Sequence, residues 1–129
     1  MLRNILKERL EPIFYAFSAR IVQATSLTAR LDFSFNDAFL MRAYIDTARD
    51  DESEVAITAD VRIDEGILSI DCAICRDDGY IYKDGPSIVS AVENELDIVA
   101  VFDRWLVEMK EYLAANEAYY ISLLRNHSN

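Results

Sequence analysis

Histidine is almost absent from this sequence, since His127 is the only one among 129 residues. It lies close to the end of the given sequence, where we expect a frayed segment. Ser–His–Asp and Cys–His catalysis need an imidazole held beside the nucleophile, and many metal sites use histidine as a ligand. The sequence therefore predicts neither kind of catalysis and no metal site built on histidine.

Glycine and proline are also scarce, with three and two residues respectively. Such a composition leaves little room for flexible linkers, and 129 residues is the usual size of one domain. Neither glycine-rich nucleotide motif, G-x-x-x-x-G-K-[ST] or G-x-G-x-x-G, occurs in the chain. We therefore expect a single domain over residues 1–129, without a nucleotide loop of these kinds and without a cofactor.

The two cysteines, Cys72 and Cys75, have the C-x-x-C spacing of thiol redox sites and of half a zinc site. They lie in a segment that alternates apolar and polar residues, so on a strand their sulfurs would point to opposite faces. The sequence has no second cysteine pair and no nearby histidine to complete a zinc site. We interpret Cys72 as a small core residue and Cys75 as its neighbour on the other face.

Long apolar runs are missing, since no segment approaches the roughly 18 consecutive apolar residues that span a bilayer. The formal net charge is −10, and residues 1–30 hold five basic and two acidic side chains, so the remainder carries −13. Such a surface repels phosphate backbones and would attract a basic protein, unless the acidity serves solubility alone. We expect a cytoplasmic protein with a protein partner, and neither nucleic-acid nor membrane binding.

Both ends of the sequence show helical periodicity. In residues 1–26 apolar side chains recur at steps of three and four, and Pro12 within this stripe predicts a kink or the start of a second helix. In residues 87–126 apolar residues recur every seven positions, with Ser87 as the expected cap. A single helix of this length would exceed the expected diameter of the domain, so we expect a break near Asn116 or a helix that extends beyond the body.

Residues 27–83 change to a period of two, which is typical of half-buried strands. The stretch 38–48 predicts a strand, although a helix is the alternative there. Turns or loops are expected at residues 36–38 and in the acidic run 50–52, which lacks the spacing and glycine of a calcium loop. The remaining strands are predicted at 27–35, 55–63, 68–74 and 80–83.

These elements predict an α+β fold, in which an antiparallel four- to five-stranded meander has both terminal helices packed on one face. The expected core draws on both helices and on the inward residues of the strands. It comprises Ile13, Phe17, Ile21, Leu31, Phe33, Met41, Ile57, Val61, Ile70, Cys72, Val99, Phe102 and Leu106.

Polar residues on the outward face of the sheet form the first candidate site. Matching the buried faces across each turn places Asp32, Arg42, Asp60 and Asp71 in one row across four strands, with Arg62 and Arg30 on neighbouring rows. The row is either an exposed ladder of charge pairs, each stabilising by well under about 1 kcal/mol, or a polar site for a cation or a basic partner residue. Paired carboxylates acting as general acid and base are the third interpretation.

The second candidate site is one edge of the wide apolar stripe in the C-terminal helix. Ile98, Trp105, Tyr112 and Tyr119 follow one another at intervals of seven residues. They either belong to the intramolecular core or form a contact ridge for a second copy or another protein, since aromatic side chains are enriched in interfaces. Spacing by sevens also favours helix pairing.

Taken together, the sequence predicts a non-enzymatic protein-binding module that forms a homodimer, with an acidic surface suited to a basic partner. Secretion chaperones and toxin-neutralising immunity proteins are also small, acidic and single-domain, an analogy of size and charge alone. The alternative is a regulator that binds a small molecule or cation through the polar sheet face around Arg42, Asp60, Arg62 and Asp71. An enzyme acting through carboxylates is the third hypothesis.

Overall fold

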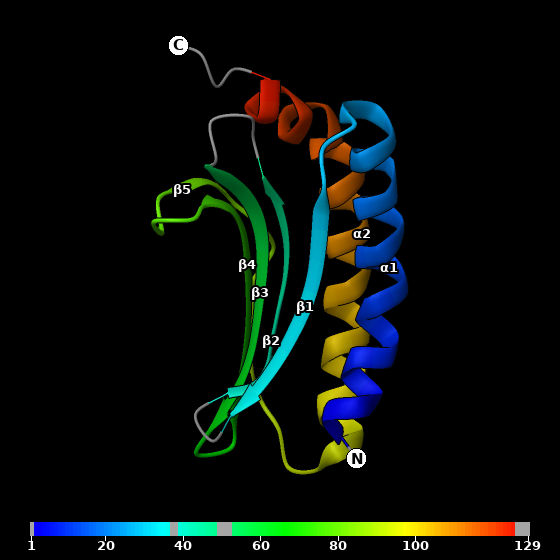
Figure 1. The fold of residues 1–129 in the computed structure, drawn as a ribbon. Helices are drawn as coiled ribbons and strands as arrows, with labels where there is room; N and C mark the ends of the chain where they lie inside the picture. The colour runs from blue at the N-terminus through cyan, green and yellow to red at the C-terminus, as the bar shows by residue number, and fades with distance from the viewer. Residues whose placement is uncertain (1, 37–38, 49–52, 126–129) are drawn as a thin grey trace.

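The computed structural model describes residues 2–36, 39–48 and 53–125; parts of the predicted turn 36–38, the acidic run 50–52 and His127 lie outside them. Both helices lie side by side on one face of a single antiparallel sheet (Figure 1), so the predicted α+β meander is confirmed. The elements are, in order, α1 (Leu2–Thr25), β1 (Ala29–Asn36), β2 (Phe39–Ala48), β3 (Glu54–Asp64), β4 (Ile67–Arg76), β5 (Ile81–Asp84), β6 (Ile88–Ala91) and α2 (Glu95–Arg125).

The first helix, α1, buries one stripe of side chains spaced by three and four residues. Its buried residues are Leu6, Leu10, Phe14, Phe17 and Ile21. Pro12 is exposed inside the helix, which continues on both sides of it. The helix ends where Ser26 adopts a φ of 62°, while the Thr25 hydroxyl donates to the carbonyl oxygen of Ile21 at 2.7 Å. The buried stripe packs against the sheet and α2.

The sheet follows the chain from β1 to β5, with β6 paired to β4. Residues 39–48 form β2, which settles the open choice between strand and helix in favour of the strand. The far edge of β4 is shared, because β6 pairs with residues 67–70 and β5 with residues 73–75. The sheet therefore has a long edge strand on one side, β1, and two short ones on the other.

The start of the second helix differs from the prediction. Residues 88–91 form β6 instead of the first turn of a helix, because they pair with β4 and continue the sheet. The helix begins at Glu95, and its cap is Asn94, not Ser87: the Asn94 side chain accepts a hydrogen bond from the amide of Asp97 at 3.0 Å. The Asp97 carboxylate in turn accepts from the amide of Glu93 at 2.8 Å, a reciprocal arrangement like a capping box. The helix then runs unbroken past Asn116.

The core lies between the helices and the inward face of β2, β3 and β4. Most predicted core residues are buried, but Ile13, Leu31, Phe33 and Val99 are only half-buried. Leu31 and Phe33 belong to β1, whose position at the edge leaves part of each side chain accessible. The predicted core residues that are fully or nearly buried are Phe17, Ile21, Met41, Ile57, Val61, Ile70, Cys72, Phe102 and Leu106.

Candidate binding groove on the outer face of the sheet

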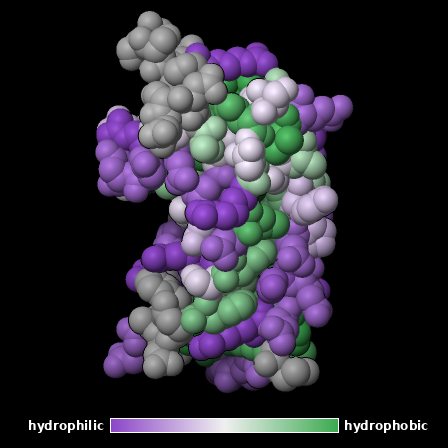
Figure 2. Space-filling view, viewed as in Figure 1, coloured by the Kyte–Doolittle hydropathy of each residue, from purple (hydrophilic) through white to green (hydrophobic). Residues whose placement is uncertain are grey.

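The sheet face that points away from the helices is concave and largely polar. Alternate residues of β2, β3 and β4 project from it, because successive side chains of a strand point to opposite faces. They line a hollow of about 580 Å³, and the left-hand outline in Figure 2 is indented on this side of the molecule, with hydrophilic residues around it. We call this hollow the outer groove; its lining includes Arg42, Tyr44, Asp46, Glu54, Asp60 and Arg76.

Three of the four residues in the predicted polar row lie opposite one another on this face. The Nε of Arg42 is 2.6 Å from Oδ1 of Asp60 across β2 and β3. Asp60 lies directly opposite Asp71 across β3 and β4, as predicted. Arg62 is exposed on a neighbouring row, opposite Ser69. The pair Arg42–Asp60 is half-exposed, so it contributes little to the stability of the fold. Its relevance lies in its position in the outer groove.

The predicted place of Asp32 is wrong by two residues. Ser34 lies opposite Arg42, and Asp32 lies opposite Tyr44. The prediction assumed a three-residue turn at 36–38 and a regular ladder. In the structure Asn36 itself pairs with Phe39, and the register shifts by one further residue between Asn36 and Ser34. The Tyr44 hydroxyl donates a hydrogen bond to Oδ2 of Asp32 at 3.0 Å. This bond stabilises the protonated phenol and, with partial burial, raises the pKa of Tyr44.

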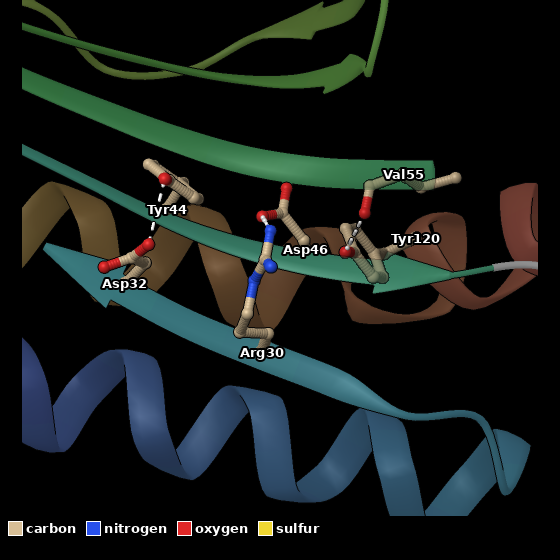
Figure 3. A network of polar contacts seen from close by, with 6 residues as sticks. All are labelled: Arg30, Asp32, Tyr44, Asp46, Val55 and Tyr120. Atoms are coloured by element: carbon tan, nitrogen blue, oxygen red, sulfur yellow. Dashed lines mark hydrogen bonds and ion pairs between the residues drawn. The ribbon is translucent and has the colours of Figure 1, made fainter. Parts of the chain in front are cut away.

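A second ion pair, between Arg30 and Asp46 (Figure 3), lies on the same face, four residues along β2 from Arg42. The Nη2 of Arg30 is 3.1 Å from Oδ2 of Asp46, whose side chain is only 14% exposed. The hydrogen bond and the charge of Asp46 raise the pKa of Arg30 above its already high value. Sequence reasoning missed Asp46 and Tyr44, although both share the outward parity of Arg42 along β2 and could have been found from that alternation.

The β4–β5 hairpin borders one side of the outer groove. Arg76 contacts Asp78 through two bonds, of 2.9 Å from Nε and 2.8 Å from Nη2, and the bond from Arg76 lowers the pKa of Asp78. The guanidinium also lies 4.7 Å from the ring centroid of Tyr80, which stacks edge-on with Tyr82. Tyr80 is 56% exposed. The border thus places the cation of Arg76, paired with Asp78, beside the exposed ring of Tyr80, and the sequence prediction did not include it.

Carboxylates outnumber arginines around the groove. Its lining holds two arginines and the acidic residues Asp46, Glu54, Asp60 and Asp77. An adjoining hollow of about 450 Å³ shares Asp60 and adds Asp71 and Asp84. A carboxylate offers about four acceptor positions, so Asp46 and Asp60 keep acceptor capacity beyond their arginine partners. The surface can therefore accept hydrogen bonds from cationic side chains of a partner.

The residues of the predicted helix ridge do not form one exposed surface. Ile98 is 6% exposed and Trp105 is fully buried, with its indole Nε1 donating to the carbonyl oxygen of Pro86 at 2.9 Å. The Tyr112 hydroxyl donates to the carbonyl oxygen of Lys83 at 3.1 Å, and Tyr119 is 36% exposed. Residues 83–86, from the end of β5 into the connection to β6, thus cover much of this edge of α2. Dimer formation itself stays a prediction.

The described residues contain no group of three or more His, Cys, Asp or Glu side chains arranged to hold a metal ion. Within the same part of the chain, no helix is both long and apolar enough to cross a membrane. In comparisons with known proteins, no protein-family model, no curated protein and no solved structure gives a significant match to the chain.

Proposed function

We propose that this chain is a non-enzymatic protein-binding module that acts as a homodimer and holds a basic segment of a partner protein in the outer groove. The observation that supports the groove as the binding surface is its combination of concave shape and excess carboxylate charge. A concave acidic surface concentrates cationic groups and steers them inward. The net negative charge of the chain after residue 30 also attracts cationic groups.

The groove has room for a short extended segment. Along the strands, the row of Arg42 and Asp60 and the row of Asp46 and Ala56 are four residues apart, roughly 13 Å, which is the length of about four extended residues. Basic residues of a segment laid along the strands would meet Asp60 on one row and Asp46 two outward-facing rows further on. Tyr44 lies between these two rows and offers an apolar ring to the stem of an arginine or lysine.

The runner-up function is a regulator that binds a small molecule on the same face. One observation favours it: the volume of about 580 Å³ lies within the roughly 300–1,000 Å³ usual for small-molecule sites. Such sites are mostly apolar, whereas this one is lined by several charged side chains. The protein-binding function is therefore the better supported of the two.

The test is a binding titration with labelled eight-residue peptides that contain three arginines, alongside peptides with glutamate in their place. We expect the basic peptides alone to bind, with affinity that falls as salt screens the charges. Asp60→Asn should weaken binding about tenfold, because a hydrogen bond to a charged group contributes about 1.5–3 kcal/mol. Asp103→Asn makes the same charge change on α2, where Asp103 pairs with Arg9, and should leave the affinity unchanged.

Equal loss in the Asp60→Asn and Asp103→Asn variants would show that only net charge matters and would reject the groove as the binding surface. If no basic peptide binds, a thermal-shift screen with small metabolites tests the runner-up. A shift that Asp60→Asn abolishes would replace the protein-binding proposal with the small-molecule one.

A further inference from the structure

Strand β1 is a long edge strand, and its open side has features that fit a second copy of this chain. It spans eight residues, whereas the strands on the opposite edge, β5 and β6, have four each. Proteins commonly keep edge strands short or interrupt them with proline or lysine to prevent pairing with other chains. Strand β1 contains neither residue, and its two charged residues, Arg30 and Asp32, are of opposite sign.

The direction of the backbone groups shows which residues of β1 would pair with a further strand. The carbonyl oxygen of Thr28 accepts from the amide of Ala48 in β2. In an antiparallel ladder alternate residues bond to the same neighbouring strand. The backbone N–H and C=O groups of Arg30 and Asp32 therefore also point towards β2. The N–H and C=O groups of Ala29, Leu31 and Phe33 then point to the open side, where β1 has no strand partner among the described residues.

Apolar side chains accompany this open backbone. Leu31 and Phe33 are half-buried at the edge, and the ammonium of Lys7 in α1 lies 5.4 Å from the ring centroid of Phe33. Lys7 therefore marks the flank of α1 that borders β1. At about 100° per residue, Tyr15 and Val22 project roughly 60–80° beyond Lys7, on the side away from α2. They are 69% and 39% exposed.

We infer that β1 pairs antiparallel with β1 of a second copy, about a two-fold axis at Leu31. In this register Arg30 of each copy lies opposite Asp32 of the other, which gives two pairs of opposite charge. No other register that places outward-facing residues opposite each other pairs opposite charges. An axis at Phe33 would place Asp32 opposite Ser34, and an axis at Ala29 would place Arg30 opposite Thr28. The interface is therefore self-complementary in charge, as a two-fold contact requires.

This pairing rests on the homodimer in the proposed function and specifies its interface. A two-fold axis perpendicular to the sheet keeps the same face outward in both copies, so the two six-stranded sheets join and the two outer grooves lie on one side. Arg30 and Asp46 are then near the centre of the joined surface. A partner with two basic segments could occupy both grooves and gain avidity from the second.

Cross-linking tests the register directly. Residues 30 and 32 of the two copies form a non-hydrogen-bonded pair with Cα atoms about 4.5 Å apart, within disulfide reach. In a Cys75→Ser background, a mixture of the Arg30→Cys chain and the Asp32→Cys chain should give a reducible dimer under mild oxidation. Either chain alone should not, because its two engineered thiols lie on a diagonal of about 7–8 Å between Cα atoms.

A charge exchange measured by light scattering provides a second, independent readout. Arg30→Asp alone places two acidic pairs at the interface and Asp32→Arg alone places two basic pairs, so each should lower the dimer affinity at least tenfold. Mixing the two variants restores opposite charges in both pairs and should restore the dimer. Circular dichroism on each variant checks that the monomer is folded, since Arg30 also pairs with Asp46 and Asp32 with Tyr44.

The outcomes separate this inference from the rest of the proposed function. A native chain that stays monomeric up to about 100 µM would overturn both the β1 pairing and the homodimer, while the peptide titration on the groove would be unaffected. A native dimer that shows no cross-link in the mixture and no response to either charge change would overturn the β1 pairing alone. A cross-link in the mixture together with charge rescue would support the stated register.

Discussion

The two faces of β3 show how one strand serves two purposes. The inward side chains Val55, Ile57, Ala59 and Val61 are fully buried under the helices, whereas Thr58 and Asp60 on the other face remain accessible and line the outer groove. The backbone is the same, so the difference comes only from the alternation of side chains. The inner face therefore contributes the buried apolar contacts of the fold, whereas the outer face stays in contact with solvent.

The polar contacts on the two faces differ in the same way. On the inner side, Tyr120 is fully buried, and its hydroxyl donates to the carbonyl oxygen of Val55 at 2.7 Å and lies 2.9 Å from the hydroxyl of Thr47. On the outer side, Arg42 and Asp60 form a half-exposed ion pair. Buried hydrogen bonds are expensive to break without replacement, whereas exposed ion pairs contribute little. Substitutions should therefore separate stability from binding.

The largest expected effect is on the inner side, for Trp105→Ala. Removing a fully buried indole should lower the free energy of unfolding by about 3–5 kcal/mol, and it also removes the donor to Pro86. Urea unfolding followed by circular dichroism measures the loss. Leu96→Ala is the matched control on the same helix, because Leu96 is 81% exposed and its truncation should change stability by less than about 0.5 kcal/mol. Equal effects would place Trp105 outside the core.

The next largest change in stability is expected for Tyr120→Phe, which keeps the ring and removes only the hydroxyl (Figure 3). Without it, the carbonyl oxygen of Val55 and the hydroxyl of Thr47 lose a partner, so unfolding should become easier by about 1–3 kcal/mol. The control is Tyr119→Phe at the neighbouring, more exposed position, with a change below about 0.5 kcal/mol. Chemical denaturation of both variants side by side checks this, and a neutral Tyr120→Phe would contradict the buried network.

On the outer face, a double-mutant cycle of Arg42→Ala and Asp60→Ala should give a coupling energy of only about 0.2–1 kcal/mol for folding. The carboxylate of Asp60 is nevertheless expected to change affinity for a basic peptide about tenfold. Measuring unfolding and peptide binding on the same four proteins compares the two directly. A coupling well above about 1 kcal/mol would mean that the outer ion pair supports the fold as the inner contacts do.

Much of the fold could be predicted because the hydropathy period is strong in each element. The change from steps of three and four to steps of two marked the boundary between α1 and β1 within a few residues. The registers β2–β3 and β3–β4 followed from matching buried faces, and they placed Arg42, Asp60 and Asp71 correctly. Local periodicity was sufficient here because each of these strands has long partners in sequence order.

The errors occurred where long-range pairing overrides local pattern. Residues 88–91 fit a helical stripe, yet they form β6 because the first half of β4 offers an unpaired edge, and no local signal reports that edge. At the β1–β2 end, the pairing of Asn36 with Phe39 and the register shift next to it placed Asp32 opposite Tyr44 instead of Arg42, and the hydropathy pattern reports neither. For Trp105 the sequence left core and interface open, because Pro86, which accepts its indole hydrogen bond, becomes its neighbour only in the folded chain.

The smallest expected effect near neutral pH is the contribution of the cysteines to stability. Cys72 lies on the inner face and Cys75 on the outer face, so the pair compares the two faces directly. Burial, with nearby Asp71 and Asp84, raises the pKa of Cys72 from the ordinary 9.0 to about 12, and burial also raises the pKa of half-buried Cys75. The folded state therefore holds the Cys72 proton more tightly than the unfolded state. That contribution to stability is complete below pH 9 and is lost as the pH rises towards about 12.

Two measurements follow from this difference between the cysteines. Alkylation by iodoacetamide at pH 8 should modify Cys75 well before Cys72, because only the former is accessible on the outer face and the thiolate is the reactive form. Between pH 9 and 11, Cys72→Ala should lose less stability with rising pH than the native chain, while Cys75→Ala should follow the native curve more closely. Faster modification of Cys72 than of Cys75 in the folded protein would show that the inner face opens to solvent, and would remove the distinction between the two faces on which the binding proposal depends.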